Sequence, residues 1–190
     1  MIETKLPEPR DGAVRIGVLA DTHVHAGQIA LPAAALEALR GVDLILHLGD
    51  MGEASVLDAL GELAPVLATR GGDDPAEDPR IAPARLLVGP LQALAAAFEL
   101  GSVVEGAQGQ GGPAFPERRA DELLRERARR AVHVVAFAAT HQPALLVRDG
   151  VLFVNPGSAT LPAKRGPSGL GTVARIVLRG RDASAEIVQL

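Results

Sequence analysis

The sequence predicts an α/β fold, because three apolar, strand-like segments alternate with two helical segments in the first half of the chain. Each of these strands is followed by a loop that carries acidic or histidine side chains. The length of 190 residues suits one domain with a sizeable core, and 47% apolar with 22% charged residues is typical of a globular protein. We therefore expect a parallel sheet with covering helices and a binding site beyond the carboxyl ends of its strands.

The composition argues against several classes of function. Cys is absent, which excludes disulfides, zinc–thiolate sites and iron–sulfur clusters. With no Trp or Tyr, 4 Phe and a net charge of −4, a nucleic-acid surface is not expected. The longest apolar stretch, residues 86–100, is short and interrupted by Gly, Pro, Gln and Glu, and the polar start does not resemble a signal peptide. We expect a cytoplasmic protein with no membrane partner.

The first half of the chain is expected to contain a polar tail, three strands and two helices. Residues 1–12 are expected to form this tail, so that a single domain covers residues 13–190. Short apolar runs predict buried strands at residues 13–20, 42–47 and 66–69. Helices are expected at residues 32–40 and 55–63, the first with an early proline and with Gly41 just past its end.

The second half is less regular. Residues 91–100 favour a helix by composition, although a buried strand is possible. Residues 101–116, rich in Gly and Pro, predict a flexible loop, and residues 116–131 predict a helix. Acids interleaved with the arginines of that helix favour a solvated face over a basic patch. Further strands are expected at residues 133–137, 151–154, 172–178 and 183–189, the last two as a hairpin.

Four side chains at strand ends carry the chemical prediction. Asp21 and His23 follow the first strand at a spacing that points both the same way in extended backbone. Asp50 follows the second strand, and His141 follows a later one. Two carboxylates and two imidazoles suit one divalent ion of Mn, Fe, Co, Ni or Zn better than Ca or Mg. Such an ion makes a water molecule a nucleophile near neutral pH.

Each part of this pattern also has a structural interpretation. A single Asp-x-His is usually a capping or solvated group, and Gly-Asp after a strand is usually a turn. His47 is expected to be packed and hydrogen-bonded rather than a ligand, and His133 to start a strand. His25 is either an extra ligand or, more simply, a loop histidine at the rim of a pocket. The order of the parts is more specific than any one of them.

Taken in order, the motifs resemble the calcineurin-like metallophosphoesterase superfamily, in particular its small bacterial YfcE-type phosphodiesterases. The motifs are DTH at 21–23, GD at 49–50, RGGDD at 70–74, LGS at 100–102, AATHQP at 138–143 and NPGS at 155–158. The resemblance runs from about residue 16 to residue 178. It implies a calcineurin-like metallophosphoesterase fold, which is a β-sandwich of mixed sheets flanked by helices.

The resemblance also implies which metal ligands are kept. One site of the family corresponds to Asp21, His23, Asp50 and His141, and all four ligands are present. The ligands that belong only to the second site correspond to Gly72, Leu100 and Ala139, none of which has a metal-binding side chain. We therefore expect one intact metal site, a degenerate second one and one divalent transition-metal ion.

The function implied is hydrolysis of a small phosphate ester by metal-activated water, with reduced or altered activity. Asp50 is expected to be catalytic as well as a metal ligand. Asp74 and Arg165 are the further catalytic candidates, because either could replace the lost second charge. Asp73, Glu99 and Lys164 are further candidates for this role, and a solvated acidic loop is the simpler explanation of the adjacent Asp73 and Asp74. The NPGS segment is expected to be a tight turn packed beneath the metal loops.

Two other functions were considered. The superfamily includes a protein that uses this fold for protein contacts, the retromer subunit Vps29, so a non-catalytic scaffold with an unknown protein partner is the alternative. The DTHVH segment also resembles the opening motif of TatD-like and amidohydrolase barrels. Those barrels typically need about 250 residues, which makes this second alternative poor.

Overall fold

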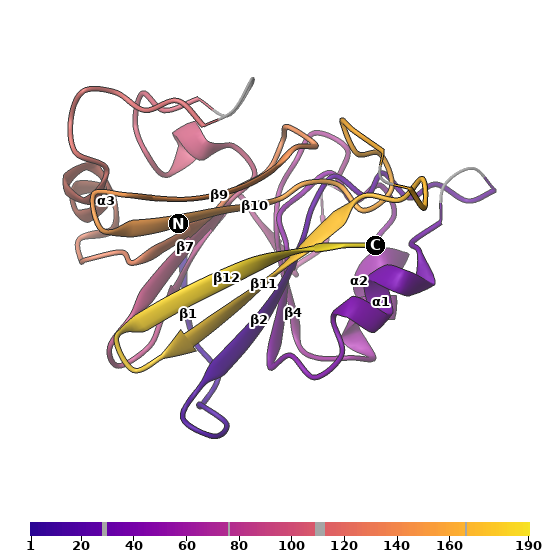
Figure 1. Ribbon diagram of the computed structural model, residues 1–190, viewed down its shortest axis with the longest axis horizontal. Helices are drawn as coiled ribbons and strands as arrows, with labels where there is room; N and C mark the ends of the chain where they lie inside the picture. The colour runs from indigo at the N-terminus through magenta and orange to yellow at the C-terminus, as the bar shows by residue number, and fades with distance from the viewer. Residues whose placement is uncertain (28–29, 76, 109–112, 166) are drawn as a thin grey trace.

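The computed structural model describes residues 1–27, 30–75, 77–108, 113–165 and 167–190. Two six-stranded mixed sheets form its centre (Figure 1). In spatial order, the first, which we call the β2 sheet, contains β12 (Asp182–Gln189), β11 (Thr172–Arg179), β2 (Val14–Leu19), β3 (Leu44–His47), β4 (Val66–Thr69) and β5 (Ile81–Ala82). The second, the β7 sheet, contains β1 (Ile2–Lys5), β6 (Ala84–Val88), β7 (Ala93–Ala97), β8 (Val134–Ala136), β10 (Val151–Pro156) and β9 (Pro143–Arg148).

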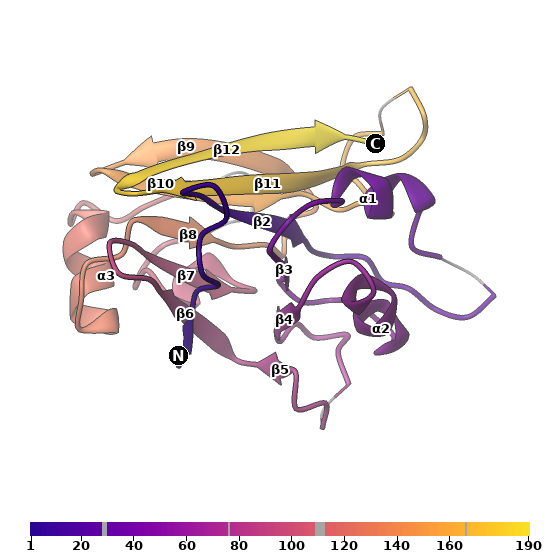
Figure 2. The same ribbon diagram turned by 90° about the horizontal axis from the view of Figure 1, so that it is seen from below.

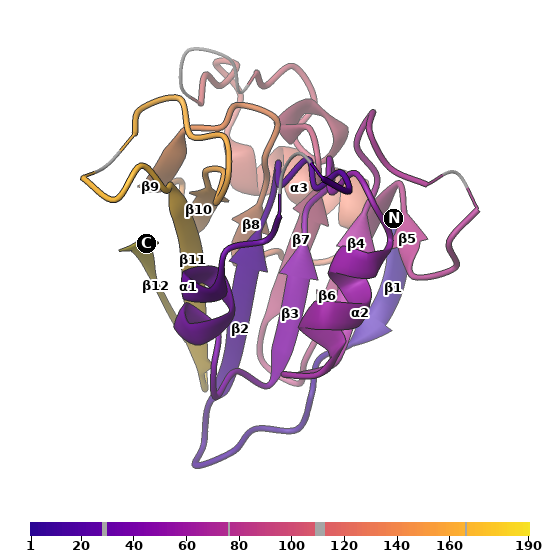
Figure 3. The ribbon, with the colours of Figure 1, turned by 90° about the vertical axis from the view of Figure 1, so that its right-hand side faces the viewer.

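Three apolar clusters hold the layers together. Val18, Leu46 and Leu94 belong to the cluster between the two sheets. The helices α1 (Ala33–Ala38) and α2 (Ser55–Gly61) pack on the outer face of the β2 sheet, as Figure 3 shows. The helix α3 (Ala120–Ala128) packs with Phe137 and Phe153 on the outer face of the β7 sheet. The order of layers is thus helix, sheet, sheet, helix.

The parallel pairing of β2, β3 and β4 confirms the alternation that the sequence predicts. Because these strands are parallel, their carboxyl ends lie at one edge of the sheet. Figure 3 shows β2, β3 and β8 running toward the same end of the molecule, where the connecting loops gather. This arrangement brings the loops that carry the predicted ligands together, although β8 belongs to the other sheet.

Two sequence predictions are corrected by the sheets. Residues 2–5 of the expected tail form β1, which pairs in parallel with β6 (Figure 2). Leu6 is buried and joins the cluster between the sheets, which explains why the segment is not a free tail. Residues 91–100 contain the strand β7 rather than a helix, since β7 lies between β6 and β8 and all five of its residues are buried.

The segment predicted as a flexible loop is partly packed. It begins with a short 3₁₀ helix, η1 (Leu100–Ser102), and Val103, Val104 and Ala107 are buried in the cluster beneath α3. Residues 109–112 of this prediction lie outside the described residues. In the part of the chain that the structure describes, no helix is long and apolar enough to cross a membrane.

Candidate metal centre

The predicted ligands meet beyond the carboxyl ends of β2, β3 and β8. Ligand atoms of Asp21, His23 and His141 all lie within 4.8 Å of one another. Asp50 borders this group, because its Oδ2 lies 3.8 Å from Nε2 of His23. Oδ1 of Asp21 lies 4.0 Å from Nε2 of His141. Two ligand atoms that each lie about 2.0–2.2 Å from one ion are at most about 4.4 Å apart, so both separations suit a shared ion.

Asp21 supplies the clearest sign that the group fits a cation. Its side chain is fully buried, and neither carboxylate oxygen makes a hydrogen bond of good geometry with the described residues. The pKa of this carboxyl is raised to about 6, mainly by burial and also by Asp50, while the charge and the nearby backbone amide of His141 and the charge of His23 oppose the shift. A buried carboxylate without partners is costly, and a bound cation would remove that cost.

Hydrogen bonds orient both histidines for metal binding. Nδ1 of His141 donates to the carbonyl oxygen of Leu161 at 2.6 Å. Nδ1 of His23 donates to Oδ2 of Asp73 at 2.9 Å. These acceptors place the proton on Nδ1, which leaves the lone pair of each Nε2 directed at the aspartates. A second hydrogen bond that fixes the ring of a ligating histidine is the usual arrangement in metal sites.

Asp73 therefore has a role that the sequence did not reveal. Its carboxylate also accepts a hydrogen bond from Nε2 of His25 at 3.2 Å. The hydrogen bond from His23 is the main cause that lowers the pKa of Asp73. His25 thus contacts the side chain that orients His23, whereas the group of ligand atoms that lie within 4.8 Å of one another contains Asp21, His23 and His141.

All four expected ligands have left-handed backbone conformations. The φ angles are 51° at Asp21, 42° at His23, 52° at Asp50 and 55° at His141. Residues other than glycine rarely adopt this backbone conformation. Residues with unusual backbone angles are more frequent at functional sites. Ala139, at one of the second-site positions, has a φ of 70°.

The NPGS segment packs under the loop after β2, as expected, although its first two residues, Asn155 and Pro156, end strand β10 rather than form a free turn. The hydroxyl of Ser158 donates to the backbone carbonyl oxygen of Asp21 at 2.6 Å. The hydroxyl of Thr160 donates to the backbone carbonyl oxygen of Thr22 at 2.7 Å. Asn155 closes its own turn by accepting from the amide of Gly157 at 2.9 Å. These bonds hold the backbone on both sides of the ligand pair.

His47 is a packed histidine, which confirms its structural interpretation. Its side chain is fully buried, and burial lowers its pKa to about 3, so the ring is neutral. Nδ1 accepts from the amide of Gly49 at 3.3 Å, and Nε2 donates to the hydroxyl of Thr22 at 2.9 Å. The ring thereby connects the loops after β2 and β3.

The comparison with protein families decides the identity of this fold. The family model described as the calcineurin-like phosphoesterase superfamily domain matches residues 14–177. The chain belongs to this superfamily. A probable metallophosphoesterase of Methanothermobacter thermautotrophicus is 31% identical over 177 residues, which cover 92% of this chain and 91% of that protein.

Solved structures of the superfamily share the fold at low sequence identity. A novel archaeal phosphodiesterase is 19% identical, with a TM-score of 0.62 over 92% of this chain and 100% of that one. Vps29 from Entamoeba histolytica, in a crystal structure with Zn²⁺, is 18% identical, with a TM-score of 0.61 over 93% of this chain and 99% of that one. These likenesses confirm the calcineurin-like fold.

The second-site positions surround this metallophosphoesterase group on one side. Leu100 and Ala139 line a pocket of about 290 Å³, and Gly72 lines a hollow of about 470 Å³ together with Asp50. A Cβ added at Gly72 would meet only Oδ1 of Asp50, at 3.9 Å, so a side chain would have room there. Of the three positions, Gly72 borders Asp50 directly, and Ala139 lies two residues before His141 in the chain.

The remaining candidates lie in different surroundings. Asp74 accepts hydrogen bonds from the amides of Asp50, Met51 and Gly71 at 3.2, 2.7 and 2.6 Å. Burial raises the pKa of Asp74, and these three amides oppose the shift. Its carboxylate thus holds two loops together. Arg165 is exposed, and its guanidinium donates to the carbonyl oxygen of Gly169 at 3.2 Å.

Proposed function

We propose that this chain is a metal-dependent phosphoesterase that uses one divalent transition-metal ion, held by Asp21, His23, Asp50 and His141. The observation that carries the proposal is the buried, unpartnered carboxylate of Asp21, which faces two histidines whose Nε2 atoms are free to bind a metal. The mixture of carboxylate and imidazole donors favours Mn, Fe, Co, Ni or Zn. The substrate is a small phosphodiester or phosphomonoester.

The protein's residues have separate tasks in this reaction. A bound divalent ion supplies a Lewis acid for a phosphoryl oxygen and increases the acidity of a water molecule. Hydrolysis adds the water oxygen to phosphorus, and the alcohol leaves with a proton. Asp73 keeps the His23 ring oriented, and Asp74 positions the Asp50 backbone. Arg165 is proposed to neutralise phosphate, because it is a cation that follows the NPGS segment in the chain and its exposed side chain is held only by a hydrogen bond to Gly169 among the described residues.

The activity is proposed to be lower than that of a two-metal relative, or altered. A pair of metals holds both the attacking and the leaving oxygens in phosphoryl transfer. Gly72, Leu100 and Ala139 carry no donor for a second ion. Loss of one electrostatic contact to a transition state typically costs about 10²–10³ in rate. We infer that loss of a whole ion has at least this effect unless another charge replaces it.

The second candidate function is a non-catalytic binding protein with an unknown protein partner. The same three missing donors favour it, together with the likeness of the fold to Vps29. Metal binding would then add to the stability of the fold without chemistry. The two functions share the metal site and differ in hydrolysis.

One experiment separates these outcomes. The protein is stripped with a chelator, reloaded with Mn²⁺ and assayed by elemental analysis and by hydrolysis of bis(p-nitrophenyl) phosphate. We expect one equivalent of metal and measurable hydrolysis, both lost in Asp50→Ala and both kept in Asp182→Ala, an exposed control. One equivalent of metal without hydrolysis supports the binding protein. No metal, or two equivalents, contradicts the single-ion site.

A further inference from the structure

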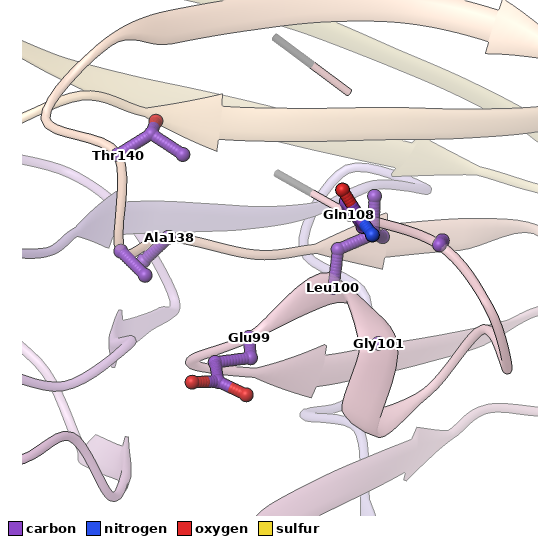
Figure 4. Close-up of a pocket in the computed structure, with 8 residues that line it drawn as sticks. Glu99, Leu100, Gly101, Gln108, Ala138 and Thr140 are labelled. Carbon is purple, nitrogen blue, oxygen red and sulfur yellow. The ribbon is translucent and has the colours of Figure 1, made fainter. Parts of the chain in front are cut away.

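The pocket of about 290 Å³ lies directly beside the candidate metal centre. Ala139 and Thr140 form part of its wall and immediately precede His141 in the chain. On the other side, the wall is formed by the segment that follows β7, which includes Glu99 and Leu100 (Figure 4). The volume is near the lower end of the range for small-molecule sites, about 300 Å³. A ligand held at the metal centre could therefore extend a short arm into this pocket.

The pocket has one charged group among the described residues that line it. Glu99 supplies a carboxylate, while Leu100, Ala107 and Ala139 supply apolar surface and Gln108 supplies an amide. Glu99 also lines the neighbouring hollow that contains Asp50. Glu99 thus borders both the pocket and the hollow of Asp50, which Arg70 also lines. Its side chain is exposed and, in Figure 4, its carboxylate lies at the edge of the pocket, so it supplies negative charge at the entrance rather than inside.

This distribution of charge selects for one kind of ester. The phosphate is anionic and is attracted to the metal side, whereas a second negative group would be repelled by Glu99. An arm with a positive charge and a small apolar surface complements both the carboxylate and the alkyl walls. On the same side, Gly72, Leu100 and Ala139 provide no ligand for a second metal ion.

We propose that the substrate is a phosphate ester with one alkylammonium arm, and that this arm lies in the pocket with its cation at Glu99. The inference rests on the proposed phosphoesterase function and names the substrate class of the same site. The substrate itself then brings positive charge to the side of Gly72, Leu100 and Ala139, where the chain has no ligands for a second metal ion. Glu99 determines specificity, and the chemistry remains at the metal centre.

The test uses two esters of matched shape. p-Nitrophenyl phosphorylcholine has a quaternary ammonium arm, and p-nitrophenyl 3,3-dimethylbutyl phosphate has the same arm with carbon in place of nitrogen. With the Mn²⁺-loaded protein, we expect kcat/KM to be about fivefold higher for the charged ester, the size that a partly exposed ion pair supports. Glu99→Gln is expected to bring this ratio close to one. Glu105→Gln, an exposed neighbour outside the pocket, is expected to leave the ratio unchanged.

The outcomes distinguish failure of this inference from failure of the proposed function. Equal kcat/KM for the two esters, or a ratio that Glu99→Gln does not change, overturns the ammonium pocket while leaving the phosphoesterase intact. If neither ester is hydrolysed, the proposed function fails, and calorimetry with phosphorylcholine and 3,3-dimethylbutyl phosphate decides the pocket. About fivefold tighter binding of phosphorylcholine, lost in Glu99→Gln, supports it, and equal or absent binding overturns it. Loss of a bound Mn²⁺ ion in Glu99→Gln would identify Glu99 as a metal ligand instead.

Discussion

The two sides of the candidate metal centre differ in how much stability they cost the fold. On the side of Asp21 and His141, a carboxylate is buried without partners and the backbone is strained at every expected ligand. On the side of Gly72 and Leu100, the positions of the second site carry no metal donor, and the acid that lines both hollows, Glu99, is exposed to solvent. A chain that had lost metal binding altogether would gain stability by relaxing the first side. The contrast is what the proposed single-ion site requires, with one metal position kept and the other without donors.

The largest effect is expected for Asp21→Asn, which removes the buried charge and a metal ligand together. We expect metal affinity to fall by at least about 10³-fold, since even loss of the groups that orient a ligand costs about 10–100-fold. Asn tolerates the left-handed backbone of this position, so the fold should survive. Competition with a metal-sensitive dye measures the affinity. Unchanged affinity would remove Asp21 from the site and with it the contrast between the two sides.

The raised pKa of Asp21 predicts an unusual pH dependence for the metal-free protein. The folded pKa is about 6 and the unfolded value is about 3.9, so between these values the folded protein keeps a proton that the unfolded chain has lost. The contribution of Asp21 to the free energy of unfolding therefore decreases as the pH rises from about 4 to 6. The total decrease is on the order of 2–3 kcal/mol. Urea unfolding should show Asp21→Asn becoming more stable than the wild type over this window, and a constant difference would contradict the prediction.

Metal ligands introduced at the second-site positions should allow both sides of the centre to bind an ion. The triple variant Gly72→Asn, Leu100→His and Ala139→His is expected to bind a second equivalent of metal. Its hydrolysis of bis(p-nitrophenyl) phosphate should rise by about 10²-fold, because a second cation stabilises charge in the transition state. Elemental analysis and steady-state rates measure both effects, with Leu100→Phe as a control that adds a ring without a nitrogen donor. A triple variant with one ion would show that these positions do not face the metal centre.

The orientation of His23 can be tested through Asp73. Asp73→Ala removes the acceptor of the Nδ1 hydrogen bond, and metal affinity should fall by about 10–100-fold. His25→Ala leaves that hydrogen bond in place and should have a much smaller effect. Metal titration of both variants gives the comparison. Equal losses of metal affinity in the two variants would mean that the contact of Asp73 with His25, rather than its hydrogen bond with His23, supports metal binding.

The smallest effect is expected for Asp74→Asn. The substituted side chain can accept fewer of the three backbone hydrogen bonds, so unfolding should require about 1 kcal/mol less. Rates should fall only as far as metal binding weakens, because Asp74 acts through Asp50. Thermal unfolding together with rates at saturating metal separates the two effects. A large loss of kcat at full metal occupancy would restore Asp74 as a catalytic residue.

The sequence was sufficient to predict the strands that carry the ligands. β2, β3 and β4 are short apolar runs, and their parallel order places Asp21 and Asp50 at one edge. β7 was misjudged because its alanines favour a helix locally, whereas burial between β6 and β8 decides the observed strand. β1 was missed because its pairing partner lies about 80 residues further along the chain.

Prediction of the candidate site stopped at the ligands. The ring orientations of His141 and His23 depend on the carbonyl of Leu161 and the carboxylate of Asp73. These partners lie 20 and 50 residues away in the chain, and no local sequence pattern predicts such contacts. Asp74 was predicted to be catalytic because it could replace the lost charge, and the hydrogen bonds that it accepts from backbone amides could not be foreseen from the sequence. The left-handed backbone of the ligands has only a weak sequence signal, because Asp and His adopt it more often than other residues besides glycine but adopt it rarely in absolute terms.

The hydrogen bond from Ser158 to Asp21 joins residues 137 positions apart, and β11 pairs directly with β2. During synthesis, β2 therefore gains its neighbour β11 and the support for its loop only after the last quarter of the polypeptide has been made. On a ribosome, the early aspartate and histidine emerge well before their late partner and the turn that secures them. Metal capture should thus be a late step of biogenesis, and truncated nascent chains should be unable to retain an ion.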